Sequence, residues 1–424
     1  MEKCVKTIRE QFLTVWGYYK NHSWCGISTI FFFTVVLLVF ITNSYLKNQY
    51  NDYFQKRTIE AETTIMTLAN SNIQTLLDEF IQIGCNAAID GALYDTTAKV
   101  LTGENKAHYS DASGTLLLDV AHKCWSREML EICHITEDML PKLFESYQAI
   151  GIISRSVAQA LGLPETVKIA AGAGDNAAAA VGSGTIGDGK CNISLGTSGT
   201  IFVSSDTFHM DQHNALHAFA HADGKYHLMG CMLSAAACNQ WWTEQILQTE
   251  DYTGEQQGIC TLGKNSVYFL PYLMGERSPH NNPRIRSMFL GMSLDTSRAQ
   301  MTQAVMEGVA YGLRDSLEVV KSLDIDAPRA TICGGGAKSS LWKKIIANVL
   351  NIPIDTVLDE GGAGLGSVMF AAVACGQYAD LAQACRQIVR VTETVEPDKE
   401  LAAAYEQGYH RFRQLYPAVE PLFG

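Results

Sequence analysis

The chain has 424 residues, with 44 acidic against 32 basic side chains and a formal net charge of −12 at pH 7. This length exceeds that of a usual single domain, so we expect two or more packed units with a large core. Lys and Arg form no clustered run, which argues against a nucleic-acid surface and favours a small-molecule partner. The 12 cysteines are scattered without a Cys-x-x-Cys pair, so we interpret them as reduced residues of a cytosolic protein.

The first hundred residues differ in character from the rest. Residues 27–46 carry no charged side chain, and a stretch of this length can cross a bilayer as a transmembrane helix. A cleaved signal peptide is the alternative, but its apolar region should be shorter, and residues 43–47 make a poor cleavage site. Apolar side chains at helical spacing over 50–83 predict an amphipathic helix. We therefore predict a membrane-anchor segment over residues 1–95, whose organisation resembles the start of a bacterial sensor protein.

From residue 97 onward, helical and strand patterns alternate with glycine-rich turns between them. This alternation is typical of α/β layers. We expect strands over 167–173 and over 192–204, the second interrupted by Gly196-Thr197-Ser198-Gly199.

The second half of the chain predicts a helix packed on the sheet. An apolar side chain recurs every fourth residue between 296 and 323, which predicts a long helix with Asp295 or Thr296 as its cap. A short strand over 329–333 then leads through three glycines to a helix over 339–350.

Three glycine-rich turns are candidates for chemistry. The first, over 171–178, places a carboxylate among small residues, although an Asp after glycines is more often only a turn or cap. The second, over 194–200, has N–H groups and hydroxyls that can hold phosphate oxygens, but a simple hairpin explains it equally well. The third, over 333–342, runs from a strand into a helix N-terminus, where nucleotides commonly meet backbone donors. Each turn alone is a weak signal.

Their order and spacing are more specific. Together with Leu270-Pro271-Tyr272-Leu273-Met274-Gly275-Glu276-Arg277-Ser278-Pro279, the turns resemble the FGGY family of carbohydrate kinases. The segment 109–115, followed by Asp119 and Trp125, is similar to the xylulokinases within that family. The resemblance covers about three quarters of the chain, and it implies the two-lobed, actin-like ATPase fold, which is ribonuclease H-like in each lobe.

The resemblance also implies roles for individual residues. Asp175 matches the catalytic base of the family, and Asn176 would contact the sugar beside it. Nucleotide-binding roles are implied for six residues. Gly196 and Thr197 match the second phosphate loop of the family, and the residues that fall where it holds adenine nucleotide are Gly275, Gly335, Gly336 and Ser340. ATP is therefore the implied cofactor, with Mg²⁺ bound largely by its phosphates and by water. The implied reaction is transfer of a phosphoryl group to a pentulose, and a dimer is possible by analogy only.

One family feature is missing from the sequence. The family opens with an Asp-x-Gly-Thr phosphate loop, which occurs nowhere in this chain. We therefore expect residues 96–183 to be a remnant of the first lobe and 184–424 to be a complete second lobe. Because one wall of the phosphate site would then be absent, we expect little or no kinase activity.

The predicted anchor conflicts with a need for ATP. Four basic residues precede the span, so the positive-inside rule would export the remainder of the chain to a compartment without ATP. Either the orientation is inverted, or the span is not used, or residues 1 to about 95 were joined to a kinase fragment by fusion or faulty assembly. We favour the last explanation, with the kinase part in the cytoplasm.

Two further motifs are weaker signals. Residues 184–190 fit a P-loop pattern, but Cys191 replaces the required Ser or Thr and a strand follows where a helix is needed. His209, His213, His217 and His221 recur every four residues as metal ligands on a helix would, yet 216–222 alternates like a strand, so we interpret them as structural.

Two other classes of function stay open. One is a membrane-anchored protein that binds nucleotide or sugar without turnover, and the other is a non-functional fusion fragment.

Overall fold

A computed structural model describes residues 101–102, 106–358 and 362–423. The predicted anchor over 1–95, with its span at 27–46 and its amphipathic helix, lies outside the described residues. Within the described ranges, no helix combines the length and the apolar character that crossing a membrane requires.

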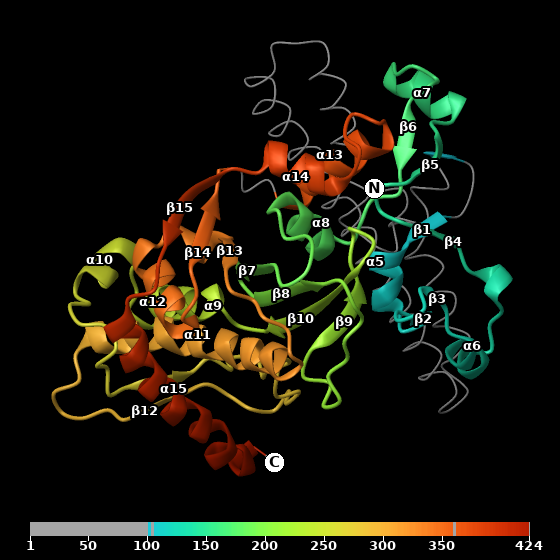
Figure 1. Cartoon of the computed structure of the whole chain (residues 1–424). Coiled ribbons are helices and arrows are strands. Elements are labelled where there is room, and N and C mark those ends of the chain that lie inside the picture. Colours follow the sequence, from blue (N-terminus) through green and yellow to red (C-terminus); the bar gives the residue numbers. More distant parts are fainter. Residues whose placement is uncertain (1–100, 103–105, 359–361, 424) are drawn as a thin grey trace, which may run out of the picture. The chain divides into compact units, whose positions relative to one another are not determined.

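A seven-stranded mixed sheet forms the centre of the described chain (Figure 1). Its order is β15-β14-β13-β7-β8-β10-β9. β13 pairs in parallel with both β7 and β14, and the remaining pairs are antiparallel. The strands are β7 (Cys191–Leu195), β8 (Gly199–Ser205), β9 (His217–Ala220), β10 (Tyr226–Met232), β13 (Ala330–Cys333), β14 (Ile354–Val357) and β15 (Val391–Val395). The predicted interruption between 192 and 204 is therefore confirmed as the turn that joins β7 to β8.

The long helix predicted between 296 and 323 is α11 (Arg298–Ser322). Its cap is Ser297, one residue beyond the expected Asp295 or Thr296. The Ser297 hydroxyl accepts from the Gln300 N–H, and the Gln300 side chain accepts from the Ser297 N–H, so a full capping box fixes the start. Val305, Val309 and Leu317 on the predicted stripe are fully buried, which confirms that this face packs into the core.

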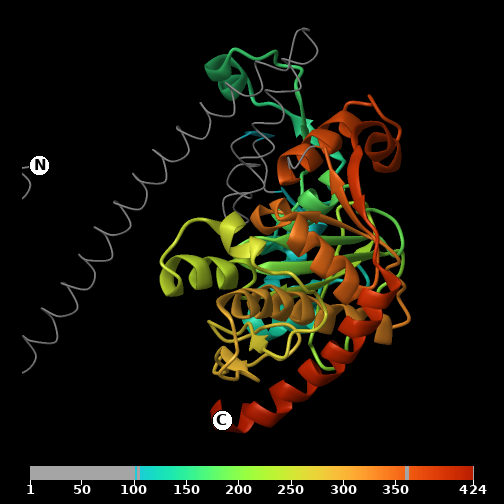
Figure 2. The same ribbon diagram turned by 90° about the vertical axis from the view of Figure 1, so that its left-hand side faces the viewer.

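Helices cover both faces of the sheet (Figures 1 and 2). One large core joins the sheet to α11, α12 and α15, and a second core forms around α8, α13 and α14. The helices are α8 (Asp175–Gly182), α9 (Ala236–Gln240), α10 (Tyr252–Gln257), α12 (Ser340–Leu350), α13 (Gly362–Ala374), α14 (Leu381–Ile388) and α15 (Lys399–Val419). A π-helical segment, η3 (Trp241–Ile246), follows α9, and the strands β11 (Tyr268–Leu270) and β12 (Met288–Leu290) pair beside α11.

α8 and α13 approach each other unusually closely because glycines lie at their contact. A Cβ on Gly182 would be 2.3 Å from the Gly362 carbonyl oxygen, and a Cβ on Gly366 would be 2.0 Å from that of Ala178. Neither position has room for a side chain. The position of α8, which begins with Asp175, therefore depends on this pairing.

The chain before α8 forms smaller elements. β1 (Lys106–His108) pairs in parallel with β4 (Lys142–Phe144), whereas β2 (Leu118–Asp119) with β3 (Cys124–Trp125) and β5 (Ala149–Ile152) with β6 (Lys168–Ala170) are antiparallel. The strand predicted over 167–173 is shorter than expected, because the chain turns at Gly172, whose φ is +80°. The remaining elements are α5 (Tyr109–Ala112), η1 (Ser113–Thr115), α6 (Arg127–Cys133), η2 (Glu137–Met139), α7 (Arg155–Leu161), η4 (Gly335–Lys338) and η5 (Glu420–Phe423).

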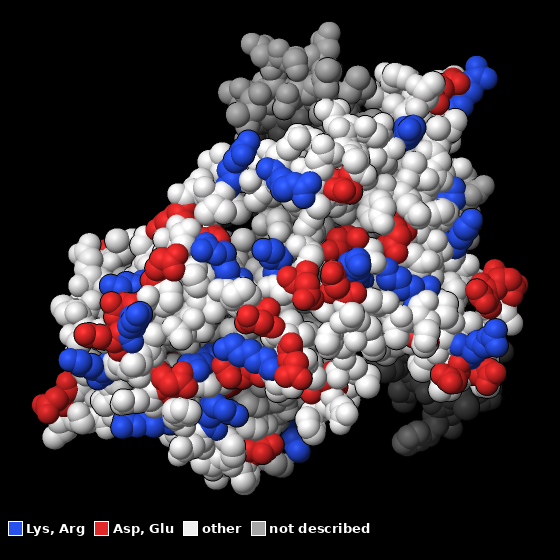
Figure 3. All heavy atoms as spheres, in the orientation of Figure 1, with Lys and Arg blue, Asp and Glu red and all other residues white. Residues whose placement is uncertain are grey.

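On the face drawn in Figure 3, acidic and basic side chains are interspersed.

Candidate active site

The turn between β7 and β8 carries two of the predicted nucleotide residues. Gly196 is half-buried, whereas Thr197 and Ser198 are exposed. The carbonyls of Gly196 and Thr197 accept hydrogen bonds from the N–H groups of Ala236 and Ala235 at 2.8 and 2.9 Å. The start of α9 therefore holds this turn in place from behind, and the Thr197 side chain stays accessible.

The glycine turn after β13 packs directly on the β7–β8 turn. Gly334 has a φ of +94°, and a Cβ there would lie 2.9 Å from the backbone of Leu195. A Cβ on Gly336 would lie 2.6 Å from the Leu195 side chain. Gly335 is different, because it is exposed and its Cβ would have no neighbour within 4 Å. The structure thus brings Gly196, Gly335 and Gly336 together, with open space over Gly335.

α12 begins at Ser340, one residue later than predicted. Ser339 is its N-cap, and its hydroxyl accepts from the Trp342 N–H at 3.1 Å and donates to Gln256 at 2.7 Å. The short helix η4 intervenes, so the N–H groups of Ala337 and Ser339 bond within the turn. Ser340 is exposed at the first helical position. This turn therefore has fewer free backbone N–H groups for a ligand than a turn in which the strand leads directly into the helix.

Asp175 and Asn176 lie at the exposed start of α8. The Asn176 backbone N–H and its side-chain amide both donate to the same oxygen of Asp175, at 2.6 and 3.0 Å. The other carboxylate oxygen accepts no hydrogen bond from the described residues. Asp175 is therefore oriented by its neighbour while one oxygen stays open to a substrate hydroxyl. In the described part of the chain, no hydrogen bond joins this pair to the two nucleotide turns.

Two residues that the sequence did not single out position the start of α8. The Gly174 N–H donates to the Ser110 hydroxyl at 3.1 Å, and Ser110 contacts His108 Nδ1 at 2.9 Å. His108 Nδ1 also accepts from the Asp111 N–H at 3.1 Å. Burial lowers the pKa of His108 to about 3, so its ring is neutral and Nδ1 can act as an acceptor. The signal for Ser110 was the motif over 109–115, which carried a resemblance but no role, whereas His108 precedes that motif.

Gly275, another predicted nucleotide residue, lies in closely packed backbone. It is buried with a φ of +82°, and a Cβ there would lie 2.6 Å from the Pro283 carbonyl oxygen. Close packing therefore explains this glycine without a ligand, and its nucleotide role stays a prediction.

The next residue, Glu276, is the group that sequence reasoning missed. Its Oε1 accepts from the Leu233 and Arg277 N–H groups at 2.9 and 2.8 Å, and burial raises its pKa to about 8. The Leu233 carbonyl accepts from the Ser198 hydroxyl at 3.3 Å. Glu276 thus supports the β7–β8 turn through the Leu233 peptide.

The weaker motifs have structural explanations. β9 covers His217–Ala220, as the alternation over 216–222 predicts, and buried His221 contacts the Thr185 carbonyl at 2.9 Å through Nε2. Burial lowers the pKa of His221. Residues 184–190 lead into strand β7. Within the described ranges, no group of His, Cys, Asp and Glu is arranged to hold a metal ion.

Comparison with protein families assigns these turns to a class. Residues 191–375 match the C-terminal domain of the FGGY family of carbohydrate kinases, and 42–182 match its N-terminal domain. The second match begins upstream of the boundary predicted at 96 and so extends into the segment that we expected to be unrelated.

Known relatives agree with this class. The chain is 36% identical to a xylulose kinase of Escherichia coli (strain K12) over 325 residues, which cover 76% of this chain and 67% of that protein. It is 35% identical to a xylulose kinase of Klebsiella pneumoniae over 332 residues, with the same coverage of 76% and 67%. The chain thus spans about two thirds of the length of these relatives.

Solved structures share the fold. A xyloylose kinase from Brucella ovis superimposes with a TM-score of 0.73 and 35% identity, over 82% of this chain and 73% of that one. A xylulose kinase from Lactobacillus acidophilus gives a TM-score of 0.74 at 25% identity, over 78% and 68%. The fold and its turns define a sugar-kinase phosphotransferase. The chain belongs to the FGGY family of carbohydrate kinases, and the predicted family and enzyme class are confirmed.

Proposed function

We propose that this chain is an ATP-dependent sugar kinase of xylulokinase type, which converts D-xylulose to D-xylulose 5-phosphate. The observation that carries this proposal is the 36% identity with a xylulose kinase over 325 residues. The exposed Asp175–Asn176 pair and the two packed glycine turns support it, because they supply a carboxylate for the sugar and backbone for a nucleotide. Both substrates are available in the cytoplasm, where we propose that the kinase part acts.

The proposed step needs little covalent chemistry from the protein. The terminal hydroxyl oxygen of the sugar forms a bond to the γ-phosphorus while the bond from that phosphorus to the ADP oxygen breaks. The free oxygen of Asp175 accepts the hydroxyl proton, and Asn176 contacts the sugar. The residues that would hold the nucleotide are Gly196, Thr197, Gly275, Gly335, Gly336 and Ser340. Mg²⁺ would be held mainly by the phosphates, and it would neutralise charge that develops on them.

We further propose that 96–183 and 184–424 represent the two lobes of the enzyme. The Asp-x-Gly-Thr motif, which the family resemblance links to phosphate binding, does not occur in this sequence. Loss of a comparable charge-stabilising group costs about 10²–10³ in turnover. We therefore expect phosphorylation to be slow relative to a xylulose kinase that carries the motif, yet dependent on the sugar and on Asp175.

A panel of sugars tests the substrate. ADP release would be measured with Mg²⁺ and ATP in the presence of D-xylulose, D-ribulose, glycerol or gluconate, because solved neighbours include a glycerol kinase and a gluconate kinase. We expect the largest kcat/KM with D-xylulose. A higher kcat/KM with glycerol or gluconate would be consistent with the FGGY family but would refute D-xylulose as the substrate.

A further inference from the structure

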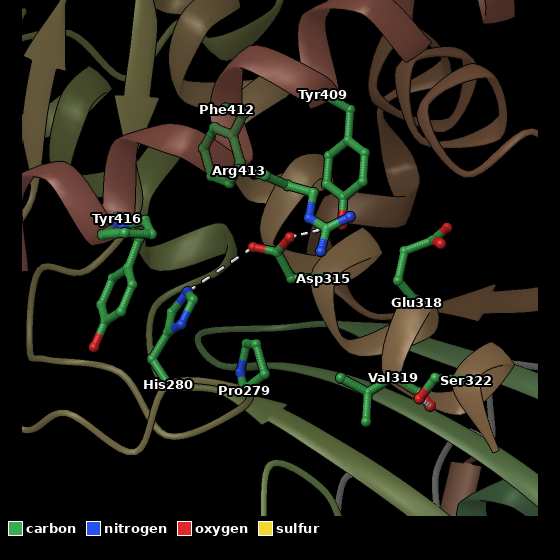
Figure 4. A pocket seen from close by; sticks show the side chains of 11 residues that line it. Pro279, His280, Asp315, Glu318, Val319, Ser322, Tyr409, Phe412, Arg413 and Tyr416 are labelled. Carbon is green, nitrogen blue, oxygen red and sulfur yellow. Dashed lines mark hydrogen bonds and ion pairs between the residues drawn. The ribbon is translucent and has the colours of Figure 1, made fainter. Parts of the chain in front are cut away.

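A cavity lies between α11 and α15. It has a volume of about 390 Å³ and is closed on a third side by the loop that carries Pro279 and His280 (Figure 4). That volume falls within the usual range for small-molecule sites. None of the residues proposed to bind sugar or nucleotide lines it.

The cavity has an aromatic wall from α15. Tyr409, Phe412 and Tyr416 line it, and the Tyr416 ring stacks on His280 with centroids 3.6 Å apart. His280 is held in turn by the Tyr272 hydroxyl at 3.0 Å from its Nε2, and burial lowers the His280 pKa to about 4, so the ring is neutral. These contacts fix the shape of the cavity before any ligand enters.

A buried carboxylate is directed into this cavity from α11. The Asp315 side chain is only 10% exposed, and its Oδ1 accepts from the Tyr409 hydroxyl at 2.7 Å. Its Oδ2 lies 3.9 Å from His280 Nε2, which is too far for a hydrogen bond. Among the described residues this oxygen has no hydrogen-bond partner, and Figure 4 shows it directed toward His280, which also lines the cavity. Burial raises the pKa of Asp315 to about 7, which adapts the group both to accept and to donate.

The charges around the cavity exclude a strongly charged ligand. Arg413 projects from α15 beside Asp315 (Figure 4), and within the described chain it forms no ion pair. Glu318 is already paired with Arg314 and Lys321 at 3.4 and 3.1 Å. A cation would be repelled by the Arg413 guanidinium, and an anion would be repelled by the carboxylates of Asp315 and Glu318. An uncharged ligand meets both an acceptor and a donor without either penalty.

We propose that this cavity is a second binding site, distinct from the kinase site, for a small uncharged polyhydroxylated molecule of the sugar or polyol class. One hydroxyl donates to the free oxygen of Asp315, another accepts from Arg413, and the C–H face of the ligand packs on the rings of Tyr409 and Phe412. This combination of a few convergent polar groups with an apolar wall is what small-molecule pockets generally show.

Ligand-observed saturation-transfer NMR on the full chain tests the site, with xylitol and D-xylose as probes. We expect both probes to bind, and Arg413→Met to weaken binding of at least one by about ten-fold or more. Arg411→Met is the matched control, because Arg411 is an exposed arginine on the same helix that does not line this cavity. It should leave binding unchanged, and the loss caused by Arg413→Met should persist in an Asn176→Ala background, where the proposed sugar contact of the kinase site is removed.

Several outcomes would overturn the proposal. These are no binding of either probe to the folded chain, equal binding by wild type and Arg413→Met, or loss of binding only in Asn176→Ala. Tighter binding of a charged probe such as inorganic phosphate or choline, weakened by Arg413→Met, would refute the proposed ligand class. Asp315→Asn provides a second test, and if that variant fails to fold, the surface variant Arg413→Met still decides the question.

Discussion

At the residue scale, the two glycine turns separate structural from exposed positions. Gly334 needs a left-handed φ of +94° and has no room for a Cβ, whereas Gly335 faces open space. Packing therefore requires glycine at one position of this short run and not at the next. Packing accounts for Gly334 and Gly336, whereas it does not account for Gly335.

This difference predicts unequal costs for alanine substitution. Gly334→Ala should lower the free energy of unfolding by about 1–3 kcal/mol, because strained backbone conformations and backbone overlaps cost that much. Gly335→Ala should change it by less than about 0.5 kcal/mol. Urea unfolding of both variants measures this. Equal effects would show that the turn after β13 does not pack on Leu195 as described.

Glu276 makes stability depend on pH in a defined direction. Burial raises its pKa in the folded protein to about 8. A Glu in an unfolded chain has a pKa of about 4.3. The folded state therefore holds the proton more tightly, and this group lowers the free energy of unfolding as pH rises between these two values.

Glu276→Gln tests this dependence, because the amide oxygen can still accept from Leu233 and Arg277 but cannot ionise. Each pKa unit is worth about 1.4 kcal/mol. We therefore compare the Tm of the variant minus the Tm of wild type at two pH values. This difference should be a few degrees more positive at about pH 8 than at about pH 5. A Tm difference that is the same at both pH values would contradict the assignment. Glu276→Ala, which removes the acceptor, should destabilise at both.

At the element scale, α8 is positioned by its neighbours rather than by its own length. It has eight residues, and glycines at its contact with α13 let the two backbones approach closely. Its first turn is held from the other direction by Ser110. Because Asp175 is the first residue of this helix, the geometry of the proposed base depends on both contacts.

Gly366→Ala should therefore lower activity, although Gly366 lies on α13 and not at the proposed site. Its Cβ would lie 2.0 Å from the Ala178 carbonyl oxygen, so α8 and α13 must separate. We expect a loss of more than about 2 kcal/mol in the free energy of unfolding and a fall in kcat. Thermal unfolding and ADP release measure the two effects. Ala374→Ser, a half-buried site on the same helix, serves as control, and a Gly366→Ala variant with its stability unchanged would rule out the close pairing.

The elements that the sequence predicted correctly are those with strong local signals. The break between β7 and β8, the strand before Gly334 and the helix α11 all follow from glycine positions or apolar spacing. The predicted start of α12 was one residue too early, because the short helix η4 lies between β13 and α12. Glu276 and Ser110 could not be assigned roles, because their partners, Leu233 and Gly174, are distant in the sequence and meet only in the folded chain.

At the scale of the whole molecule, the described chain carries two chemically distinct proposed sites. One is the proposed kinase site, where glycine turns and the start of α8 supply the chemistry. The other is the α11–α15 cavity, built from segments around 280, 315 and 413 that no local pattern connects. Family resemblance predicted the first and could not predict the second, because only folding brings those segments together.

The central claim is that this chain transfers phosphate from ATP to a sugar with Asp175 as the base. The most direct test follows the γ-phosphate of labelled ATP into D-xylulose 5-phosphate, with wild type, Asp175→Asn and the exposed control Asp206→Asn measured side by side. We predict slow, sugar-dependent transfer by wild type and Asp206→Asn, and none by Asp175→Asn. Transfer that is equal in all three proteins, or that is absent from all three, would contradict it.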